Sequence, residues 1–210
     1  MPLLQIKSFE QCIIGIWEMS EPVVELLSLL QPGEKEKAEL YLITSPVRKK
    51  EYLAVRSLLK AMKGCGPHIT HTADGKPFLS GDTQHISITH SRNLAAIILS
   101  DFPAGIDTET TGRKVSDVAQ RFLSEEEMAW TLNAPHIELA QLFCWSCKEA
   151  AYKMLGIPGI DFKHTLTVCP EEIREKGTSS VVFKSPGREK IIRMNYFLLA
   201  NNIITWCVNI

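Results

Sequence analysis

Two acidic residues, Asp107 and Glu109, stand two positions apart in the segment 104–109, which follows an apolar run at 94–99. This pattern predicts a strand, and residues two apart on a strand lie on the same face. Two carboxylates on one face repel each other unless a cation neutralises them, and carboxylate oxygens suit a hard ion such as Mg²⁺. Taken alone, the pair is better explained as two acids on a solvated sheet face, which is the more common arrangement.

The segment 138–155 has the spacing of a long helix with two chemically different sides. The apolar side is formed by Phe143, Cys147, Ala150 and Met154. The opposite side carries Trp145, Glu149, Tyr152 and Lys153, with Lys148 beside them. Glu149 and Lys153 are four residues apart and can form a surface ion pair worth ~0.3–0.5 kcal/mol. They can also supply a metal ligand or general base and a contact to a phosphate oxygen.

Three polar residues in the first half are candidates for an anion site. His90 follows an alternating segment at 84–89, where a histidine is usually a local hydrogen-bonding group but can also donate to a phosphate. Lys76 lies in a Gly-Lys-Pro turn, either simply exposed or close to a nucleotide phosphate. Arg56 falls within a predicted helix and, taken alone, is an ordinary surface arginine.

Cys144 and Cys147 form a C-x-x-C pattern, which opens a redox interpretation. A redox dithiol sits at a helix N-terminus, where the dipole lowers the thiol pKa, whereas this pair lies inside the segment 138–155. A zinc site needs two more ligands, and there is no second C-x-x-C. We therefore interpret both cysteines as small apolar residues.

The composition, 45% hydrophobic and 22% charged, is that of an ordinary folded protein. A formal net charge of -1 argues against a nucleic-acid partner, which requires a basic field. No apolar run has the length of a membrane helix, and residues 1–16 lack the basic start of a secretory signal. Six scattered cysteines do not indicate a disulfide framework, so we expect a reduced, cytoplasmic protein with no membrane partner.

Periodicity and turn signals predict the elements that position these residues. Up to residue 109 we expect a strand within 3–17, a short helix capped by Ser20, helices at 34–43 and 46–63, and strands at 84–89, 94–99 and 104–109. In the second half we expect a helix at 115–122, a capping box at Ser124 and Glu127, the helix 138–155, and strands at 165–168, 180–183, 191–199 and 203–208. The mixture predicts an α+β fold.

The order of these patterns resembles the 4'-phosphopantetheinyl transferase superfamily, most closely its surfactin-synthetase-activating type. The most specific motifs are Gly-Ile-Asp-Thr-Glu at 105–109 and Trp-Ser-Cys-Lys-Glu-Ala-Ala-Tyr-Lys at 145–153. The others are Gly-Lys-Pro at 75–77, Ile-Ser-Ile-Thr-His-Ser at 86–91 and Phe-Leu-Ser-Glu-Glu-Glu at 122–127. Thr89 stands where the family often has serine, and it still offers a hydroxyl.

The resemblance implies two similar α+β halves, 1–103 and 104–210, in a pseudo-twofold arrangement within one monomer, with coenzyme A in the cleft between them. It implies transfer of the 4'-phosphopantetheine group of coenzyme A to a serine of an apo acyl or peptidyl carrier protein. The other product is adenosine 3',5'-bisphosphate, as for holo-acyl-carrier-protein synthases. The carrier is expected to be small, acidic and helical and to dock near 115–122.

The site residues implied by the resemblance fall into three groups. Asp107, Glu109 and Glu149 would bind Mg²⁺, with Mn²⁺ as an alternative ion. The residues that would contact coenzyme A are Arg56, Lys76, Thr89, His90, Lys148 and Lys153. Glu149, as general base, and Lys153, at the pyrophosphate or leaving group, would be catalytic.

Two other functions are compatible with the same residues. A metal-dependent hydrolase of a nucleotide diphosphate would use the carboxylates without any carrier. A non-catalytic module that binds coenzyme A or a carrier would keep the fold without the chemistry, although the intact set Asp107, Glu109, Glu149 and Lys153 argues against it.

Overall fold

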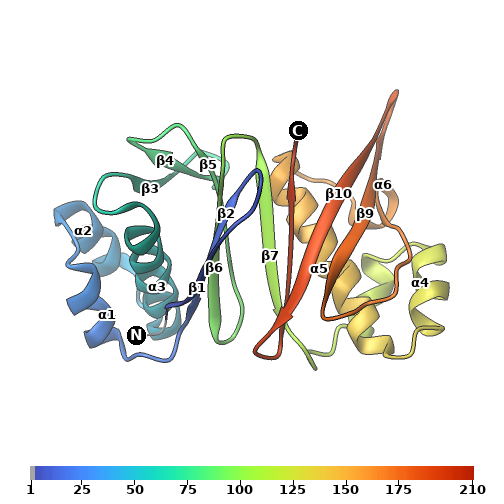
Figure 1. Cartoon of the computed structure of the whole chain (residues 1–210), viewed down its shortest axis with the longest axis horizontal. Helices are drawn as coiled ribbons and strands as arrows, with labels where there is room; N and C mark the ends of the chain where they lie inside the picture. Colours follow the sequence, from blue (N-terminus) through green and yellow to red (C-terminus); the bar gives the residue numbers. More distant parts are fainter. Residues whose placement is uncertain (1–2) are drawn as a thin grey trace. The chain divides into compact units, whose positions relative to one another are not determined.

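A computed structural model describes residues 3–210; residues 1 and 2, part of the expected first half and of the segment assessed for a secretory signal, lie outside the described residues. The chain forms two compact units, of which the first ends at Asp101 and the second runs from Phe102 to Ile210. Each unit is built on an antiparallel sheet with a long helix packed against it (Figure 1). The predicted α+β class is therefore confirmed, while the pseudo-twofold relation of the halves stays a prediction.

The first unit contains a four-stranded sheet of order β1-β2-β6-β5 and a separate two-stranded sheet, β3-β4. Its strands are β1 (Leu3–Ser8), β2 (Ile13–Glu18), β3 (His68–His71), β4 (Pro77–Ser80), β5 (His85–His90) and β6 (Leu94–Ser100). Its helices are α1 (Val23–Leu30), α2 (Glu34–Leu42) and α3 (Pro46–Lys63). All strand pairs in the four-stranded sheet are antiparallel.

Helix α3 is the main partner of the first sheet, contacting β2 and β6. It begins where Ser45 caps the Arg48 amide and Pro46 occupies the first turn, positions that suit these residues. Its apolar side includes Leu53 and Leu58, which are fully buried. A Cβ on Gly15 of β2 would lie 2.4 Å from the Met62 sulfur, so the helix lies very close to that strand.

The second unit has a five-stranded antiparallel sheet of order β7-β11-β10-β9-β8. Its strands are β7 (Ala104–Thr110), β8 (Leu166–Val168), β9 (Lys176–Ser185), β10 (Arg188–Leu199) and β11 (Asn202–Val208). Its helices are the 3-10 helix η1 (Ser116–Arg121), α4 (Glu125–Leu132), α5 (Ile137–Leu155) and the short α6 (Phe162–Thr165). Figure 1 shows α5 lying across the strands of this sheet.

Helix α5 packs mainly on β7 and β11. The residues predicted for its apolar side, Phe143, Cys147, Ala150 and Met154, are all buried in the core of the unit. A Cβ on Gly105 of β7 would lie 1.9 Å from the Ala150 carbonyl oxygen, so only glycine permits this approach. The close contact fixes the spacing between the strand and the helix that carry the candidate site.

Several local predictions require correction. The segment expected to hold one strand forms the hairpin β1–β2. Helix α1 is preceded by Pro22 rather than capped by Ser20, and no side chain caps it. The expected helix at 115–122 is a single 3-10 segment, η1. By contrast, the capping box is present: Ser124 Oγ accepts from the Glu127 amide and a Glu127 carboxylate oxygen accepts from the Ser124 amide.

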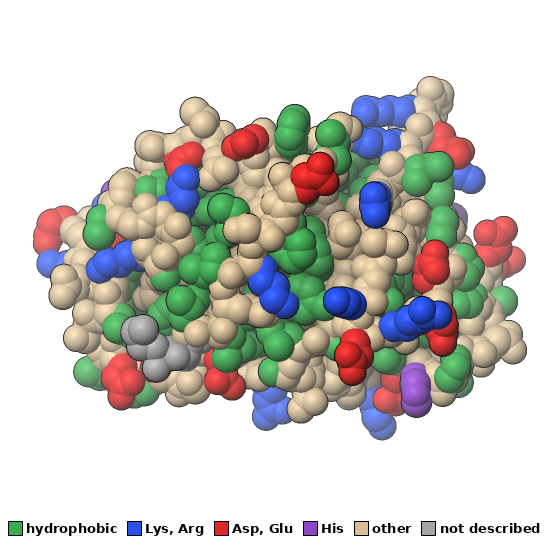
Figure 2. Space-filling model, in the orientation of Figure 1, with side chains coloured by type: hydrophobic (Ala, Val, Ile, Leu, Met, Phe, Trp, Pro, Cys, Tyr) green, Lys and Arg blue, Asp and Glu red, His purple; other side chains and the backbone are tan. Residues whose placement is uncertain are grey.

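The surface of the described residues carries both signs of charge. On the face drawn in Figure 2, lysine and arginine side chains are interspersed with aspartate and glutamate. This mixture agrees with the formal net charge of -1. Within residues 3–210, no helix is both long enough and apolar enough to cross a lipid bilayer.

Candidate functional site

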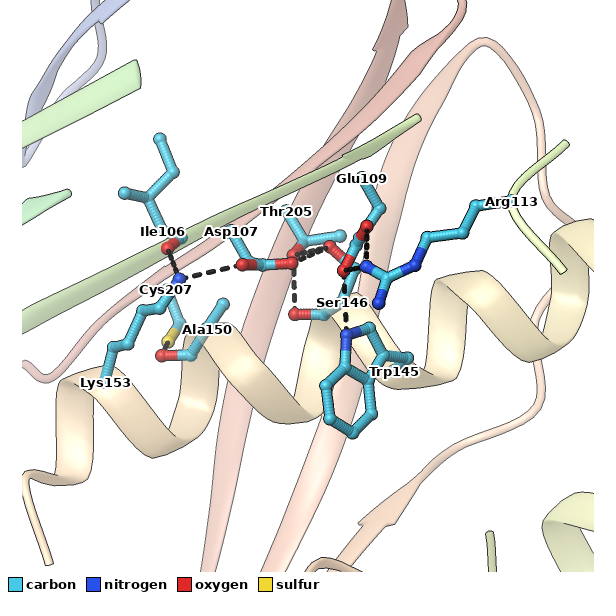
Figure 3. Close-up of polar contacts among 10 residues, drawn as sticks. All are labelled: Ile106, Asp107, Glu109, Arg113, Trp145, Ser146, Ala150, Lys153, Thr205 and Cys207. Carbon is cyan, nitrogen blue, oxygen red and sulfur yellow. Dashed lines mark hydrogen bonds and ion pairs between the residues drawn. The ribbon is translucent and has the colours of Figure 1, made fainter. Parts of the chain in front are cut away.

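The strand β7 and the helix α5 bring the candidate acids and lysine together on one side of the second unit. Asp107 and Glu109 lie on β7, where they pair in register with Thr205 and Ile203 of β11. Figure 3 shows both carboxylates directed toward α5, from which Trp145, Ser146 and Lys153 project.

Asp107 is 5% exposed and is held by two side chains of α5. Lys153 Nζ donates to Asp107 Oδ1 at 2.8 Å and also to the Ile106 carbonyl oxygen at 3.1 Å. Ser146 Oγ donates to Asp107 Oδ2 at 2.9 Å. Ser146 is in turn tied to β11, because Thr205 Oγ1 donates to the Ser146 carbonyl oxygen at 2.9 Å. Asp107 therefore has a fixed orientation at the centre of the cluster.

Glu109 is 8% exposed and has a different set of partners. Arg113 NH1 lies 2.7 and 2.6 Å from its two carboxylate oxygens, and Trp145 Nε1 donates to Oε1 at 2.8 Å. Burial raises the pKa of Glu109; the hydrogen bond from Arg113 opposes this shift and the charge of Asp107 adds to it. The arginine thus acts as the counter-ion of this carboxylate.

Glu149 is half-buried and differs from the other two acids because no described residue donates a hydrogen bond to its carboxyl group. Burial, which is the largest cause, and the charges of Asp107 and Glu109 together raise its pKa to about 7, while Lys153 and Arg113 oppose the shift. A carboxyl group with this pKa and no fixed partner can take up or release a proton near neutral pH.

The three acids have the donor chemistry of a magnesium site. Among residues 3–210, however, no group of three or more His, Cys, Asp or Glu side chains is arranged to hold a metal ion. Lys153 and Arg113 instead form ion pairs with Asp107 and Glu109. The negative charges of Asp107 and Glu109 still repel that of Glu149, and a divalent cation would relieve this repulsion. The three carboxylates are therefore chemically suitable ligands for Mg²⁺. The assignment of these acids as metal ligands stays a prediction.

The burial and hydrogen bonds of Lys148 contradict the prediction that this residue contacts coenzyme A. Its side chain is 0% exposed. Its ammonium donates to Glu127 Oε2 at 2.7 Å, to the Phe122 carbonyl oxygen at 2.6 Å and to the Phe162 carbonyl oxygen at 2.8 Å. Because an ammonium has three N–H groups, none remains for a ligand. The helical pattern placed Lys148 at the edge of the polar side, but the segments before α4 and after α5 cover it.

A groove of about 640 Å³ lies beside Glu149, within the second unit. It is lined by Val118, Arg121, Phe122, Trp145, Glu149, Tyr152, Gly159, Ile160, Asp161 and Phe162. The Trp145 ring centroid lies 5.0 Å from that of Phe122 and 5.6 Å from that of Phe162. The groove therefore has aromatic walls and two carboxyl groups, those of Glu149 and Asp161.

Arg56 on α3 is not a surface arginine. It is 8% exposed, NH2 lies 3.0 Å from a Glu39 carboxylate oxygen, and Nε lies 3.8 Å from a Glu36 oxygen. Its guanidinium also stacks 3.3 Å from the centroid of the Tyr52 ring. The two acids of α2 occupy the arginine, so any phosphate at this position would compete with them.

The other first-half candidates lie at the ends of strands. Lys76 is exposed in the turn between β3 and β4, where Gly75 has a φ of +80°. Thr89 and His90 end β5, Thr89 buried and His90 exposed. His90 Nδ1 lies 3.4 Å from a Glu51 carboxylate oxygen. Their contact with a nucleotide stays a prediction.

The C-x-x-C pair is part of the core. Cys144 and Cys147 are both 0% exposed, and burial raises the pKa of each thiol well above its usual value. All six cysteines are free. The interpretation of this pair as small apolar residues is confirmed, and the raised thiol pKa is the opposite of what a dithiol catalyst needs.

Four residues of the site were not singled out from the sequence. Arg113 and Ser146 contact the acids, Thr205 contacts Ser146, and Phe162 forms a wall of the groove. Ser146 had a detectable signal, since it precedes Glu149 by three residues and so lies one helical turn away. Thr205 had none, because its position opposite Asp107 depends on strand register.

Known proteins are similar to the segment that carries this site. Residues 103–198 match the model of the 4'-phosphopantetheinyl transferase superfamily. The 4'-phosphopantetheinyl transferase gsp of Aneurinibacillus migulanus is 32% identical over 84 residues, which are 39% of this chain and 35% of that protein. The alignment thus spans about a third of that relative's length. The matched segment contains the whole charged cluster of β7 and α5, so this part of the chain is similar to the 4'-phosphopantetheinyl transferase superfamily.

Proposed function

We propose that the chain transfers the 4'-phosphopantetheine group of coenzyme A to a serine hydroxyl of an apo acyl or peptidyl carrier protein. The observation that carries this proposal is the cluster of Asp107, Glu109, Glu149 and Lys153, which lies inside the segment that matches the superfamily. The hydroxyl oxygen bonds to the β-phosphorus, and the bond from that phosphorus to the bridging pyrophosphate oxygen breaks. Adenosine 3',5'-bisphosphate leaves.

Asp107, Glu109 and Glu149 are the residues that would hold Mg²⁺, or Mn²⁺ in its place. The ion would supply positive charge to the pyrophosphate oxygens. In the described structure, Arg113 and Lys153 neutralise two of these acids, since they pair with Glu109 and Asp107.

Glu149 is the best candidate for the group that accepts the serine proton, directly or through a water. Its carboxyl group lacks a fixed hydrogen-bond donor among the described residues and has a pKa of about 7. It also lines the groove, so a hydroxyl entering from that side would meet it. Asp107 and Glu109 are less suited, since each has two side-chain donors in place.

Lys153 is placed to stabilise charge on the leaving group. Two of its three N–H groups are used, by Asp107 and by the Ile106 carbonyl oxygen. The side chain is 26% exposed, so the third N–H can reach a phosphate oxygen. A donor held in place before reaction loses little free energy to reorganisation during the transfer.

The nucleotide end of coenzyme A would contact residues of the first unit, with Lys76, Thr89 and His90 as candidates. A phosphate could also bind Arg56, but it would have to compete with Glu39 for the guanidinium. The carrier would dock at η1, since Val118, Arg121 and Phe122 line the groove beside Glu149.

The free cysteines agree with a reducing, cytoplasmic location. The relative named above supports the surfactin-synthetase-activating type over the holo-acyl-carrier-protein synthase type.

The experiment that separates transfer from hydrolysis measures adenosine 3',5'-bisphosphate by chromatography. The chain is incubated with coenzyme A and Mg²⁺, with and without an apo carrier protein. A transferase releases the nucleotide only with the carrier and in equal amount to the carrier modified. Release without a carrier would favour the hydrolase, and no release with acyl or peptidyl carriers would favour the binding module.

A further inference from the structure

Lys148 and Glu127 form a buried ion pair that the proposed chemistry does not use. Lys148 Nζ and Glu127 Oε2 are 2.7 Å apart, with side-chain exposures of 0% and 1%. Charged groups are rarely buried this completely unless each has several hydrogen-bond partners. The partners of this pair therefore indicate what the burial achieves.

Glu127 connects α4 to the segment before it and to the sheet. Its Oε2 accepts from the Ser124 amide at 2.7 Å, and its Oε1 accepts from the Val168 amide of β8 at 2.7 Å. Lys148 adds the Phe122 and Phe162 carbonyl oxygens to the same network. Through these hydrogen bonds, one ion pair connects five elements: the end of η1, α4, α5, α6 and β8.

The two carbonyl groups bound by Lys148 belong to residues whose rings form the groove. The rings of Phe122 and Phe162 both contact Trp145, with centroid distances of 5.0 and 5.6 Å. Trp145 in turn donates to Glu109 at 2.8 Å. The width of the groove and the position of the Trp145 indole consequently depend on where Lys148 holds the two backbone segments.

An apolar residue in the place of Lys148 would fill the same space without fixing these segments. Buried ion pairs contribute little net stability compared with apolar residues of similar volume, because their desolvation is costly. Burial lowers the pKa of Lys148, and the charge of Glu127 opposes that shift. The directional contacts, rather than stability, are what an ammonium provides here that a methionine does not.

We propose that Lys148 is a positioning residue: by holding the Phe122 and Phe162 carbonyls it sets the width of the groove that receives the carrier beside Glu149. This inference rests on the proposed function for the identity of the carrier. It differs from a coenzyme A contact, because all three N–H groups of Lys148 are directed to the protein itself. Lys148 acts on the acceptor side of the reaction and not on the nucleotide.

The test compares steady-state kinetics and coenzyme A binding for the full chain and its variants. Lys148→Met keeps an unbranched side chain that is one heavy atom shorter and removes the ammonium. The double variant Lys148→Met/Glu127→Gln keeps an acceptor for the Val168 amide and avoids an unpaired buried carboxylate. The matched control is Lys184→Met, since Lys184 is 61% exposed on β9 and lies outside the groove.

We expect the double variant to raise the KM for an apo carrier about tenfold while leaving the Kd for coenzyme A, measured by calorimetry, within about twofold of the original chain. The control should change neither. A rise in the coenzyme A Kd with an unchanged carrier KM would overturn the inference. An unchanged carrier KM in a folded double variant would do the same.

A second readout tests the inference without relying on carrier modification. With 5-fluorotryptophan incorporated, the Trp145 resonance, assigned by Trp145→Phe, should shift or broaden in the double variant and stay in place in Lys184→Met. If the original chain modifies no carrier, the proposed function fails, and this spectrum still decides the positioning role. A Trp145 resonance unmoved by the double variant would show that Lys148 does not hold the groove.

Discussion

A Cβ at Gly105 would lie 1.9 Å from the carbonyl oxygen of Ala150, so β7 and α5 approach each other more closely than any other residue at this position allows. Asp107 and Glu109 follow Gly105 on the strand, and Glu149 and Lys153 flank Ala150 on the helix. The same contact therefore sets the core packing and the spacing of the charged cluster.

Gly105→Ala should destabilise the protein by about 3 kcal/mol or more, because the added methyl meets backbone atoms of α5 that have no room to move. Chemical denaturation monitored by circular dichroism measures this loss. Gly66→Ala is the matched control, since no atom lies within 4 Å of its Cβ position and its φ is ordinary. Equal stability of the two variants would mean that α5 does not contact β7 as described.

Glu149 should give the metal-free protein a distinctive pH dependence. Its pKa is raised from 4.5 in the unfolded chain to about 7 in the folded one, so between these values the folded state holds the extra proton. Stability from this group is therefore full below about pH 4.5 and is lost as the pH rises through about 7, by on the order of 3 kcal/mol.

The measurement is the free energy of unfolding from pH 5 to 8 in EDTA, for the original chain and for Glu149→Gln. The difference in stability between the two should change with pH in the stated direction, and added Mg²⁺ should reduce the change if the acids bind it. Parallel stability curves for the two proteins in EDTA would contradict the raised pKa.

Arg113 should compete with a divalent cation for Glu109. Its NH1 lies within 2.7 Å of both carboxylate oxygens, yet the side chain is 56% exposed, so the ion pair is weak enough to be displaced. We expect Arg113→Ala to bind Mn²⁺ about fivefold more tightly, or ~1 kcal/mol, in a titration followed by electron paramagnetic resonance.

Arg174→Ala provides the control for this titration, because Arg174 forms an exposed pair with Glu172 away from the cluster. It should leave the Mn²⁺ affinity unchanged. Weaker Mn²⁺ binding by Arg113→Ala would mean that the arginine supports the metal site rather than competing with it.

Cys144 and Cys147 should matter for packing alone. We expect the double variant Cys144→Ala/Cys147→Ala to lose about 1–3 kcal/mol of stability and to retain transfer activity that does not depend on added reductant. Activity at a temperature well below the unfolding midpoint, with and without dithiothreitol, tests this. Loss of activity in a variant that is still folded would revive the redox interpretation.

The elements that carry the site could be predicted because their patterns are local. Helix α3 occupies the predicted 46–63, and α5 begins one residue before the predicted 138–155. The strand of Asp107 and Glu109 and the capping box of Ser124 were likewise detectable from spacing alone. Each signal depends on neighbours within four residues, which the sequence displays directly.

The contacts that correct the predictions come from residues far apart in the chain. Lys148 is buried because carbonyls 26 and 14 residues away cover it, and a helical pattern contains no information about them. Arg56 is buried because Glu39, 17 residues earlier, pairs with it. Tertiary packing decides whether a charged residue at the edge of a helix faces a ligand or the protein itself.

The most direct test of the central claim is the intact mass of an apo acyl carrier protein and an apo peptidyl carrier protein after incubation with the chain, coenzyme A and Mg²⁺. We predict that at least one carrier gains the mass of a single phosphopantetheine group, and that EDTA or Asp107→Ala abolishes the gain. Neither carrier gaining mass, with a protein shown to be folded and to bind coenzyme A, would contradict the proposed transfer.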